Sequence, residues 1–115
     1  MQTQGISLTS LVEFTKNLPQ VRKADVCAGD IIFVKSRNSV YTISVLGNGK
    51  YTVSGGWFEK KYHSPMNISI NGCSWGGSAI KIDVVAACGL CIEFGNRVRT
   101  SMIEKIFVLK KRLQN

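Results

Sequence analysis

The chain has 115 residues and a formal net charge of +8, because 15 lysines and arginines outnumber 7 aspartates and glutamates. A single domain of this length buries about two-thirds of the surface of its unfolded chain, so neither a disulfide nor a metal is needed for folding. No apolar run approaches the roughly 20 residues that span a membrane, and no secretion signal opens the sequence, which predicts a soluble cytoplasmic protein without a membrane partner. The positive charge favours negatively charged partners at long range.

Residues 1–23 predict an N-terminal helix and a linker, followed by a small β domain over residues 24–115. Three apolar residues share one helical stripe in this first segment: Leu8, Leu11 and Val12. The residue before Pro19 is disfavoured in the α region, so we expect the helix to span about Thr9–Asn17. A helix this short is marginal by itself, so we expect it to dock on the β domain or on a partner.

The clearest strand pattern lies on either side of Gly47-Asn48-Gly49. Two stretches of alternating apolar and hydroxyl residues flank these glycines, which predicts a β-hairpin closed by a three-residue loop. This loop sets Val45 opposite Tyr51 and Ile43 opposite Val53. The other face then carries uncharged hydroxyl groups, and we expect that it can join copies of the chain into a homo-oligomer. These hydroxyl residues are Thr42, Ser44, Thr52 and Ser54.

Further strands are predicted before and after this hairpin. The continuous apolar run Ile31–Val34 predicts a strand that is covered on both faces. Asn71-Gly72 is the strongest short turn signal, and a two-residue turn there would direct Cys73 and Trp75 into the core. Capping-box spacing over Thr100–Glu104 predicts a single helical turn. The remaining predicted strands are Met66–Ile70, Ile80–Val84, Leu90–Phe94 and Ile106–Leu109.

The length of the turn at Gly95-Asn96 determines which residues enter the core. A two-residue loop would place Arg97 and Arg99 on the apolar face, whereas a three-residue loop places Val98 there and pairs Glu93 with Arg99 outside. We therefore expect the longer loop. Together these patterns predict a mainly β fold, a small antiparallel SH3-like or OB-like barrel that is partly open and has five to seven strands.

Gly72-Cys73-Ser74-Trp75-Gly76 has the G-x-S-x-G pattern of a hydrolase nucleophile elbow. The elbow requires a strained strand-to-helix turn with the catalytic histidine later in the chain. Here the segment is expected in a hairpin, and the single histidine, His63, precedes Ser74. We therefore expect no catalytic residue and no enzyme, and keep a minimal hydrolase as the third interpretation.

The four cysteines could hold a metal only if several of them converge. Cys88 and Cys91 have the spacing of a zinc knuckle or a redox pair, but zinc would need further ligands from Cys27, Cys73 or His63. Apolar residues surround the pair, where cysteine acts as a small buried side chain. We expect reduced thiols and neither a metal nor a cofactor.

The segment Trp57–His63 interleaves aromatic and basic side chains directly after the hairpin. Aromatic faces stack on bases while cations contact phosphate, so this segment suits a nucleic acid or a nucleotide. In the alternative interpretation, Trp57, Phe58 and Tyr62 only anchor a connection on the core, and the lysines are solvated. The predicted ligand-binding residues are Trp57, Lys60, Lys61, Arg97 and Arg99.

Three short motifs carry a resemblance. They are Asn38-Ser39-Val40-Tyr41, Gly72–Ser78 and Thr100-Ser101-Met102-Ile103, which match N-S-x-Y, G-x-x-W-G-G-S and T-S-x-V/I patterns. Through them the chain from about Gly29 to Leu109 resembles a group of small bacterial β-domain proteins, and this resemblance carries no function.

Two functions remain open from the sequence. The first is a non-enzymatic binding protein whose partner is a phosphate-bearing ligand, either nucleic acid or a nucleotide. The second is a protein-interaction module, for example a small phage or mobile-element inhibitor that docks on a larger enzyme. Such a module would use its N-terminal helix or the hydroxyl-rich hairpin face.

Overall fold

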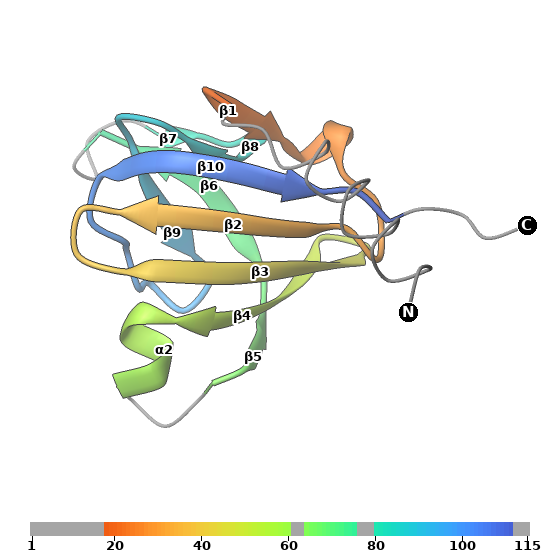
Figure 1. Cartoon of the computed structure of the whole chain (residues 1–115), viewed down its shortest axis with the longest axis horizontal. Coiled ribbons are helices and arrows are strands. Elements are labelled where there is room, and N and C mark those ends of the chain that lie inside the picture. The colour runs from red at the N-terminus through yellow and green to blue at the C-terminus, as the bar shows by residue number, and fades with distance from the viewer. Residues whose placement is uncertain (1–17, 61–63, 76–79, 112–115) are drawn as a thin grey trace, which may run out of the picture.

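Alternating apolar and polar residues form a succession of antiparallel strands in the computed structural model, which describes residues 18–60, 64–75 and 80–111 (Figure 1). The elements in chain order are β1 (Gln20–Arg22), the 3₁₀ turn η1 (Lys23–Asp25), β2 (Ile31–Ser36), β3 (Val40–Gly47), β4 (Lys50–Gly55), α2 (Gly56–Lys60), β5 (Met66–Ile68), β6 (Ile70–Ser74), β7 (Ile80–Lys81), β8 (Val84–Ala87), β9 (Cys91–Phe94) and β10 (Ile103–Leu109). The prediction of a mainly β, antiparallel fold is confirmed.

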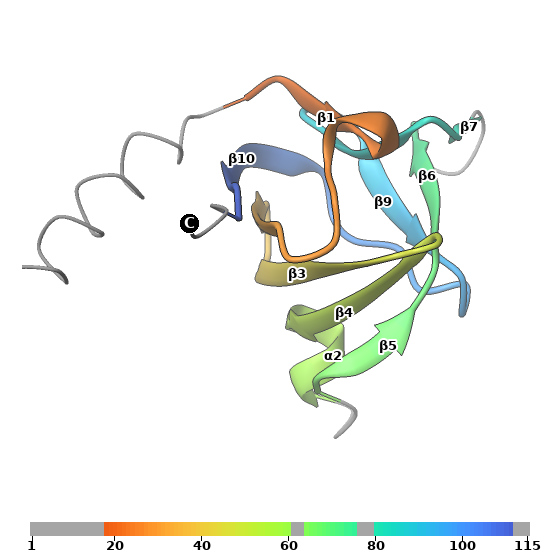
Figure 2. The same cartoon turned by 90° about the vertical axis from the view of Figure 1, so that its right-hand side faces the viewer.

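The described strands form three sheets. Five strands in the order β10-β2-β3-β4-β5 make the largest, β7-β6-β9 make the second, and β1 pairs with β8 in the third. Figures 1 and 2 show the largest sheet as one layer and the two smaller sheets as a second layer on its inner side. β5 and β6 are consecutive and lie in different layers, so Ser69 between them marks the point where the chain passes from one layer to the other.

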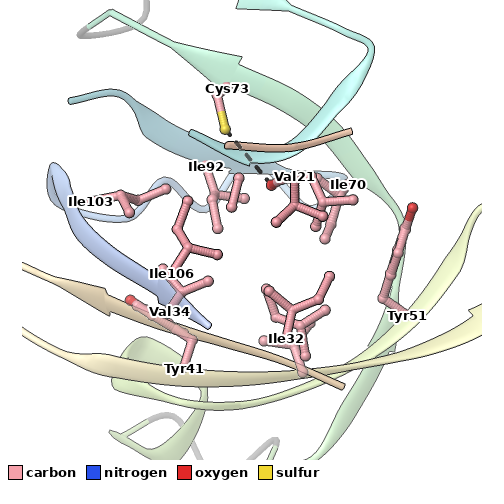
Figure 3. Packing of buried hydrophobic residues seen from close by; sticks show 14 of the residues in the cluster. Val21, Ile32, Val34, Tyr41, Tyr51, Ile70, Cys73, Ile92, Ile103 and Ile106 are labelled. Carbon is pink, nitrogen blue, oxygen red and sulfur yellow. Dashed lines mark hydrogen bonds between the residues drawn. The ribbon is translucent and has the colours of Figure 1, made fainter. Parts of the chain in front are cut away.

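The core lies between these two layers. Side chains from β2 and β3 point toward those of β6 and β9, as Figure 3 shows for Ile32, Ile70 and Ile92. Every residue of β8 is buried, and this strand packs against β6, β9 and β10. The valines and alanines of β8 are short enough to fit such a crowded position.

The hairpin of β3 and β4 has the predicted register. Ile43 pairs with Val53 and Val45 with Tyr51. The predicted three-residue loop is wrong, because Gly47 pairs with Lys50 and leaves only Asn48 and Gly49 in the turn, and an irregularity between Val45 and Gly47 accommodates the shorter loop. Asn48 and Gly49 take φ values of 55° and 76°, the left-handed conformations of a two-residue hairpin turn. The four hydroxyl residues of the outer face are half-buried. One of them, Thr52, donates a hydrogen bond to Asn67 Oδ1 on β5 at 2.7 Å.

The prediction that the run Ile31–Val34 is covered on both faces is wrong. Ile32 and Val34 are fully buried, whereas Ile31 and Phe33 are half-buried on the outer face. On that outer face Phe33 pairs in register with Phe107 of β10, so two apolar residues lie on neighbouring strands of this face.

The predicted hairpin turn at Asn71-Gly72 is also wrong, because both residues lie inside β6. The register shifts between Ile70 and Gly72, and a side chain at Gly72, whose φ is 142°, would place Cβ 2.3 Å from the carbonyl oxygen of Lys81. The glycine therefore serves close approach of two backbones instead of a turn. Cys73 is buried as predicted, but β6 ends at Ser74 and Trp75 is 64% exposed.

Two other predictions near the end of the chain are wrong. β7 ends at Lys81 and a turn follows, so Ile82 is 66% exposed instead of lying in a strand that leads to Val84. The helical turn predicted over Thr100–Glu104 is absent from the described chain, and β10 already begins at Ile103. There Ile103 N donates to Leu90 O at 2.8 Å, a bond to a neighbouring segment that holds the backbone extended.

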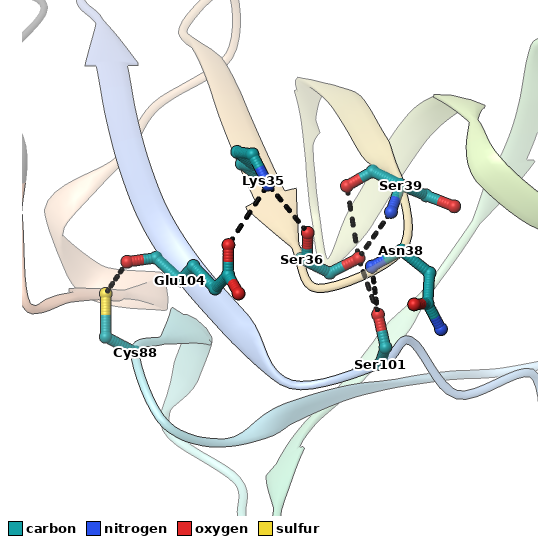
Figure 4. Close-up of polar contacts among 7 residues, drawn as sticks. All are labelled: Lys35, Ser36, Asn38, Ser39, Cys88, Ser101 and Glu104. Carbon is teal, nitrogen blue, oxygen red and sulfur yellow. Dashed lines mark hydrogen bonds and ion pairs between the residues drawn. The ribbon is translucent and has the colours of Figure 1, made fainter.

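The N-S-x-Y and T-S-x-I motifs meet at one polar junction, shown in Figure 4. Ser101 Oγ donates to Ser36 Oγ at 2.8 Å and accepts a hydrogen bond from Asn38 N at 3.0 Å. Ser36 Oγ in turn donates to Ser39 O and accepts from Ser39 N, both at 3.1 Å. These motif residues therefore join the β2–β3 turn to the segment that leads into β10.

Several predictions lie outside the described residues: the helix over Thr9–Asn17 and the positions of Tyr62 and His63. Within the described part of the chain, the helices are too short or too polar to cross a membrane.

Candidate functional site

The first part of the predicted site is the short helix α2, which two glycines place over Tyr41. Gly55 and Gly56 have φ values of 95° and 51°, and a Cβ at Gly56 would lie 2.3 Å from the Tyr41 ring. Only glycine therefore lets the chain turn from β4 into α2 so close to the sheet. As a result Phe58 is completely buried, while Trp57 is half-buried.

An aromatic stack connects α2 to the end of β9. Trp57 packs edge-on against Phe58 with ring centroids 5.3 Å apart, and Phe58 packs edge-on against Phe94 at 5.0 Å. Such pairs stabilise a structure by about 0.5–1.5 kcal/mol beyond the burial of their area. The anchoring interpretation therefore describes Phe58 correctly, and the partly accessible Trp57 keeps surface that a ligand can contact.

The second part is the turn that follows Phe94, and it has the predicted three-residue length. Arg97 N donates to Phe94 O at 3.0 Å, and Phe94 N donates to Val98 O at 2.9 Å. Arg97 takes a φ of 71°, and its exposed side chain makes no ion pair with a described residue. Val98, expected inside, is half-buried against the core.

Arg99 lies beside this turn and makes the predicted cross-strand ion pair. Its Nε lies 2.7 Å from Glu93 Oε2, and the same carboxylate oxygen accepts a hydrogen bond from the Ser74 hydroxyl. Arg99 remains about half exposed, at 47% of its side chain, so its terminal nitrogens stay accessible to a second anion. Ser74 itself is 1% exposed within β6.

Of the five predicted ligand-binding residues, the structure describes Trp57, Arg97 and Arg99, and it describes Lys60 only in its backbone. Trp57 and Lys60 lie on α2, and the stack links α2 to the turn that bears Arg97 and Arg99. The side chain of Lys60 and the whole of Lys61 lie outside the described part of the structure.

The cysteines form no metal site in the described part of the chain, where no three potential ligands converge. Burial raises the pKa of the Cys73 thiol to about 12, and burial also raises the pKa of Cys88. The Cys88 thiol lies 3.5 Å from the carbonyl oxygens of Leu18 and Glu104. These two thiols have the environment of structural cysteines, not of reactive ones.

One pocket lies at the other end of β4 and was missed by sequence reasoning. It has a volume of about 160 Å³ and is lined by residues of η1, the following loop, and the β3–β4 hairpin. Its polar side chains are Lys23, Cys27, Asn48, Lys50 and Tyr51. The combination Gly-Asn-Gly-Lys-Tyr was visible in the sequence, but Lys23 is separated from it by 24 residues or more and joins it only through the fold.

The described geometry defines a mainly β, antiparallel protein with two basic regions at opposite ends of β4. Comparison with protein-family models, with curated proteins and with solved structures gives no match for this chain.

Proposed function

We propose that the chain is a non-enzymatic binding protein for a phosphate-bearing ligand, either a nucleic acid or a nucleotide. Trp57 offers a face for stacking, and Arg97 and Arg99 offer guanidinium groups for phosphate, with Lys60 and Lys61 extending the basic surface. The observation that carries this proposal is the stack Trp57–Phe58–Phe94, because Phe94 leads directly into the turn that bears the arginines.

In the proposed mechanism, buried aromatic residues position the side chains that contact the ligand. Phe58 and Phe94 are completely buried and hold Trp57 and the arginine turn at fixed places on one side of the core. Stacking on an aromatic side chain contributes about 1–3 kcal/mol per base, and it tolerates any base because every base has a π face. Each phosphate neutralised by an arginine or lysine releases counterions, so binding must weaken as salt rises.

The finer description of the fold belongs to this proposal. We propose an SH3-like or OB-like, partly open barrel, since β5 and β6 carry the chain from one layer to the other, and Leu18 N donates to Ile106 O of β10, the edge strand of the largest sheet. OB-folds bind single strands with stacking aromatics and cationic grooves, which is the same combination of residues.

The test is a titration with a fluorescent single-stranded oligonucleotide and with a free nucleotide, at several salt concentrations. We expect Arg97→Gln to weaken binding and to reduce the slope of log K against log salt by about 1. Trp57→Ala should weaken binding about 5- to 150-fold without changing that slope. Lys105→Gln on β10, at the opposite edge of the largest sheet, is the matched control for charge. Binding that is independent of salt, or equal losses in Arg97→Gln and Lys105→Gln, would contradict the proposal.

The second candidate function, a protein-interaction module, is favoured by the outer face of the five-stranded sheet. One row across this face consists of Phe107, Phe33, Thr42 and Ser54, all half-buried. Lys35 and Lys105 form the next registered pair. Lys35 is paired with Glu104 at 3.0 Å, whereas Lys105 makes no ion pair with a described residue, so the margin of this row keeps one uncompensated positive charge. The occupant that fits is a larger protein with an apolar centre and an acidic margin.

Native mass spectrometry of the protein purified from its cells tests this second function. A complex of defined mass that is lost in Thr42→Lys and kept in Lys81→Gln would support it. A bare chain, a homo-oligomer, or a complex that survives Thr42→Lys would argue against it.

A further inference from the structure

The pocket at the β3–β4 hairpin has the chemistry of a site for a small anion. Its volume of about 160 Å³ is below the about 300–1,000 Å³ of pockets that enclose drug-sized ligands, so it suits a group the size of a phosphate. Val26 and Val45 form its apolar wall, and Lys23 and Lys50 approach it from different elements.

The two lysines give the pocket its positive charge. Neither Lys23 nor Lys50 makes an ion pair with a described residue. The nearby carboxylates are already engaged, since Asp25 pairs with Arg22 at 3.3 Å and Asp30 pairs with Lys110 at 2.6 Å. Two lysines that line one pocket and have no carboxylate partner among the described residues give the pocket a positive potential, which attracts an anion.

Tyr51 supplies an independent observation that points to a ligand. This pocket residue is 4% exposed, and its phenol makes no hydrogen bond to any described residue. Burial is the one cause of the raised pKa of Tyr51, as expected for a phenol that lacks such a partner. No buried side-chain nitrogen or oxygen of the described residues lacks a hydrogen-bond partner, so the Tyr51 hydroxyl reaches the accessible surface of the pocket and is able to donate to a ligand there. An anion in the pocket would accept this hydrogen bond.

The backbone of the hairpin loop completes the pocket. Gly47, Asn48 and Gly49 have φ values of 98°, 55° and 76°, so three successive residues are left-handed. Turns of unusual handedness can direct successive N–H groups toward one anion. Gly47, Asn48 and Gly49 all line the pocket, so an anion bound there would lie against this loop.

We propose that this pocket binds a phosphoryl oxyanion, either free inorganic phosphate or the terminal phosphate of a monoester, through Lys23, Lys50 and the Tyr51 hydroxyl. The site is separate from the Trp57 surface, because Lys50 and Gly55 are the two ends of β4. Six residues of strand span about 20 Å, so one small anion cannot contact both sites.

The experiment is an NMR titration with sodium phosphate and, separately, with phenyl phosphate, at constant ionic strength kept with chloride. We expect saturable shifts of the amide signals of Gly47, Asn48, Gly49 and Lys50. Lys50→Gln and Tyr51→Phe should each raise Kd about tenfold, since each variant removes one hydrogen-bond donor to the charged anion. Lys105→Gln should leave Kd unchanged. Tighter binding of phenyl phosphate identifies a monoester, and equal or weaker binding identifies the free anion.

Tyr51→Phe removes a hydroxyl without a partner among the described residues, so its urea midpoint should equal that of the wild type. If Tyr51→Phe does not fold, the Kd of Lys50→Gln for phosphate tests the proposal by itself. Shifts that do not saturate, or a Kd that neither variant changes, would overturn the assignment. Arg97→Gln should retain phosphate binding in the pocket, so failure of this site and failure of the Trp57 surface are told apart.

Discussion

Lys110 Nζ lies 2.6 Å from Asp30 Oδ2, and this ion pair ties the end of β10 to the residue that opens β2. The Asp30 side chain is 3% exposed, and it also accepts hydrogen bonds from the backbone N–H groups of Cys27 and Lys111, both at 2.8 Å. One buried carboxylate therefore holds together the start of β2, the end of β10 and the loop that borders the anion pocket.

The Asp30 network predicts loss of stability in acid. Burial by itself raises the pKa of Asp30, but the hydrogen bonds from Lys110, Lys111 and Cys27 outweigh it and lower the pKa below its ordinary value. A lowered folded-state pKa adds stability that is fully present above the unfolded pKa of about 3.9 and is lost as pH falls through the folded value. Urea unfolding from pH 7 to pH 2 should show this loss.

Asp30→Asn is the matched variant for that measurement. At pH 7 it should lower the free energy of unfolding by about 2 kcal/mol, because hydrogen bonds to a charged acceptor are weakened. The difference from the wild type should shrink as pH falls below the unfolded pKa of about 3.9 and through the lower folded-state pKa, where the native carboxylate becomes protonated. A difference that stays constant down to pH 2 would contradict this origin of the acid sensitivity.

Gly72→Ala should destabilise the protein strongly. The new Cβ would meet the Lys81 carbonyl oxygen at 2.3 Å, and a backbone atom cannot move aside without breaking the pairing of β6 with β7. We expect a loss of about 3 kcal/mol or more in urea unfolding. Gly49→Ala is the control, since its φ is 76° but no atom lies within 4 Å of the added Cβ, so only the left-handed cost of about 1–2 kcal/mol applies. Equal losses in the two variants would refute the steric argument.

The sequence correctly predicted elements whose signals are local. Its predictions were wrong where contact with a distant segment determines the conformation. The register of Ile43 with Val53 follows from alternation, and the pairing of Glu93 with Arg99 follows from alternation and loop length, so both were predictable. The loop at Gly47–Gly49 was predicted one residue too long, because alternation does not reveal the irregularity between Val45 and Gly47. Gly72 carried the same turn signal as a hairpin, but the approach of Lys81 decides its role. Ile82 likewise alternated correctly and yet lies exposed in a turn, because β8 begins only at Val84.

The thiols should differ sharply in reactivity. Cys73 is completely buried and its pKa is raised to about 12, so it stays protonated at pH 8, whereas Cys27 is exposed beside the anion pocket. Iodoacetamide at pH 8 should therefore alkylate Cys27 within minutes and leave Cys73 unmodified until urea is added. Peptide mass spectrometry gives the site of each modification. Rapid native alkylation of Cys73 would show that β6 opens far more readily than its burial implies.

The candidate sites, like the strands, could be predicted from the sequence only where their signals are local. Trp57 and the two arginines could be proposed from their residue types, but the stack that relates them depends on Phe94, which is 36 residues beyond Phe58. The anion pocket depends on Lys23 and Tyr51, which alternation assigns only to a linker and to a core position. Convergence of residues from separate strands is a property of the fold, so no local pattern reveals it.

Arg97 has a left-handed backbone conformation that glycine would adopt at a smaller cost in folding free energy. Its φ of 71° lies in the left-handed region, which costs a residue with a side chain about 1–2 kcal/mol, whereas glycine takes it freely at the expense of more chain entropy in the unfolded state. Arg97→Gly should therefore leave the fold about 0.5–1 kcal/mol more stable in urea unfolding. The same variant should bind oligonucleotide more weakly, because the exposed guanidinium is lost.

Arg97→Gln separates the two effects. It keeps the left-handed side chain and removes the charge, so it should match the wild type in stability and match Arg97→Gly in weakened binding. If Arg97→Gly gains stability and loses binding, the strained arginine contributes to ligand binding while it lowers the stability of the fold. Such strained residues are common at functional sites. If Arg97→Gly binds as well as the wild type, the turn has no part in the ligand site, and the Trp57 surface would then have to act without it.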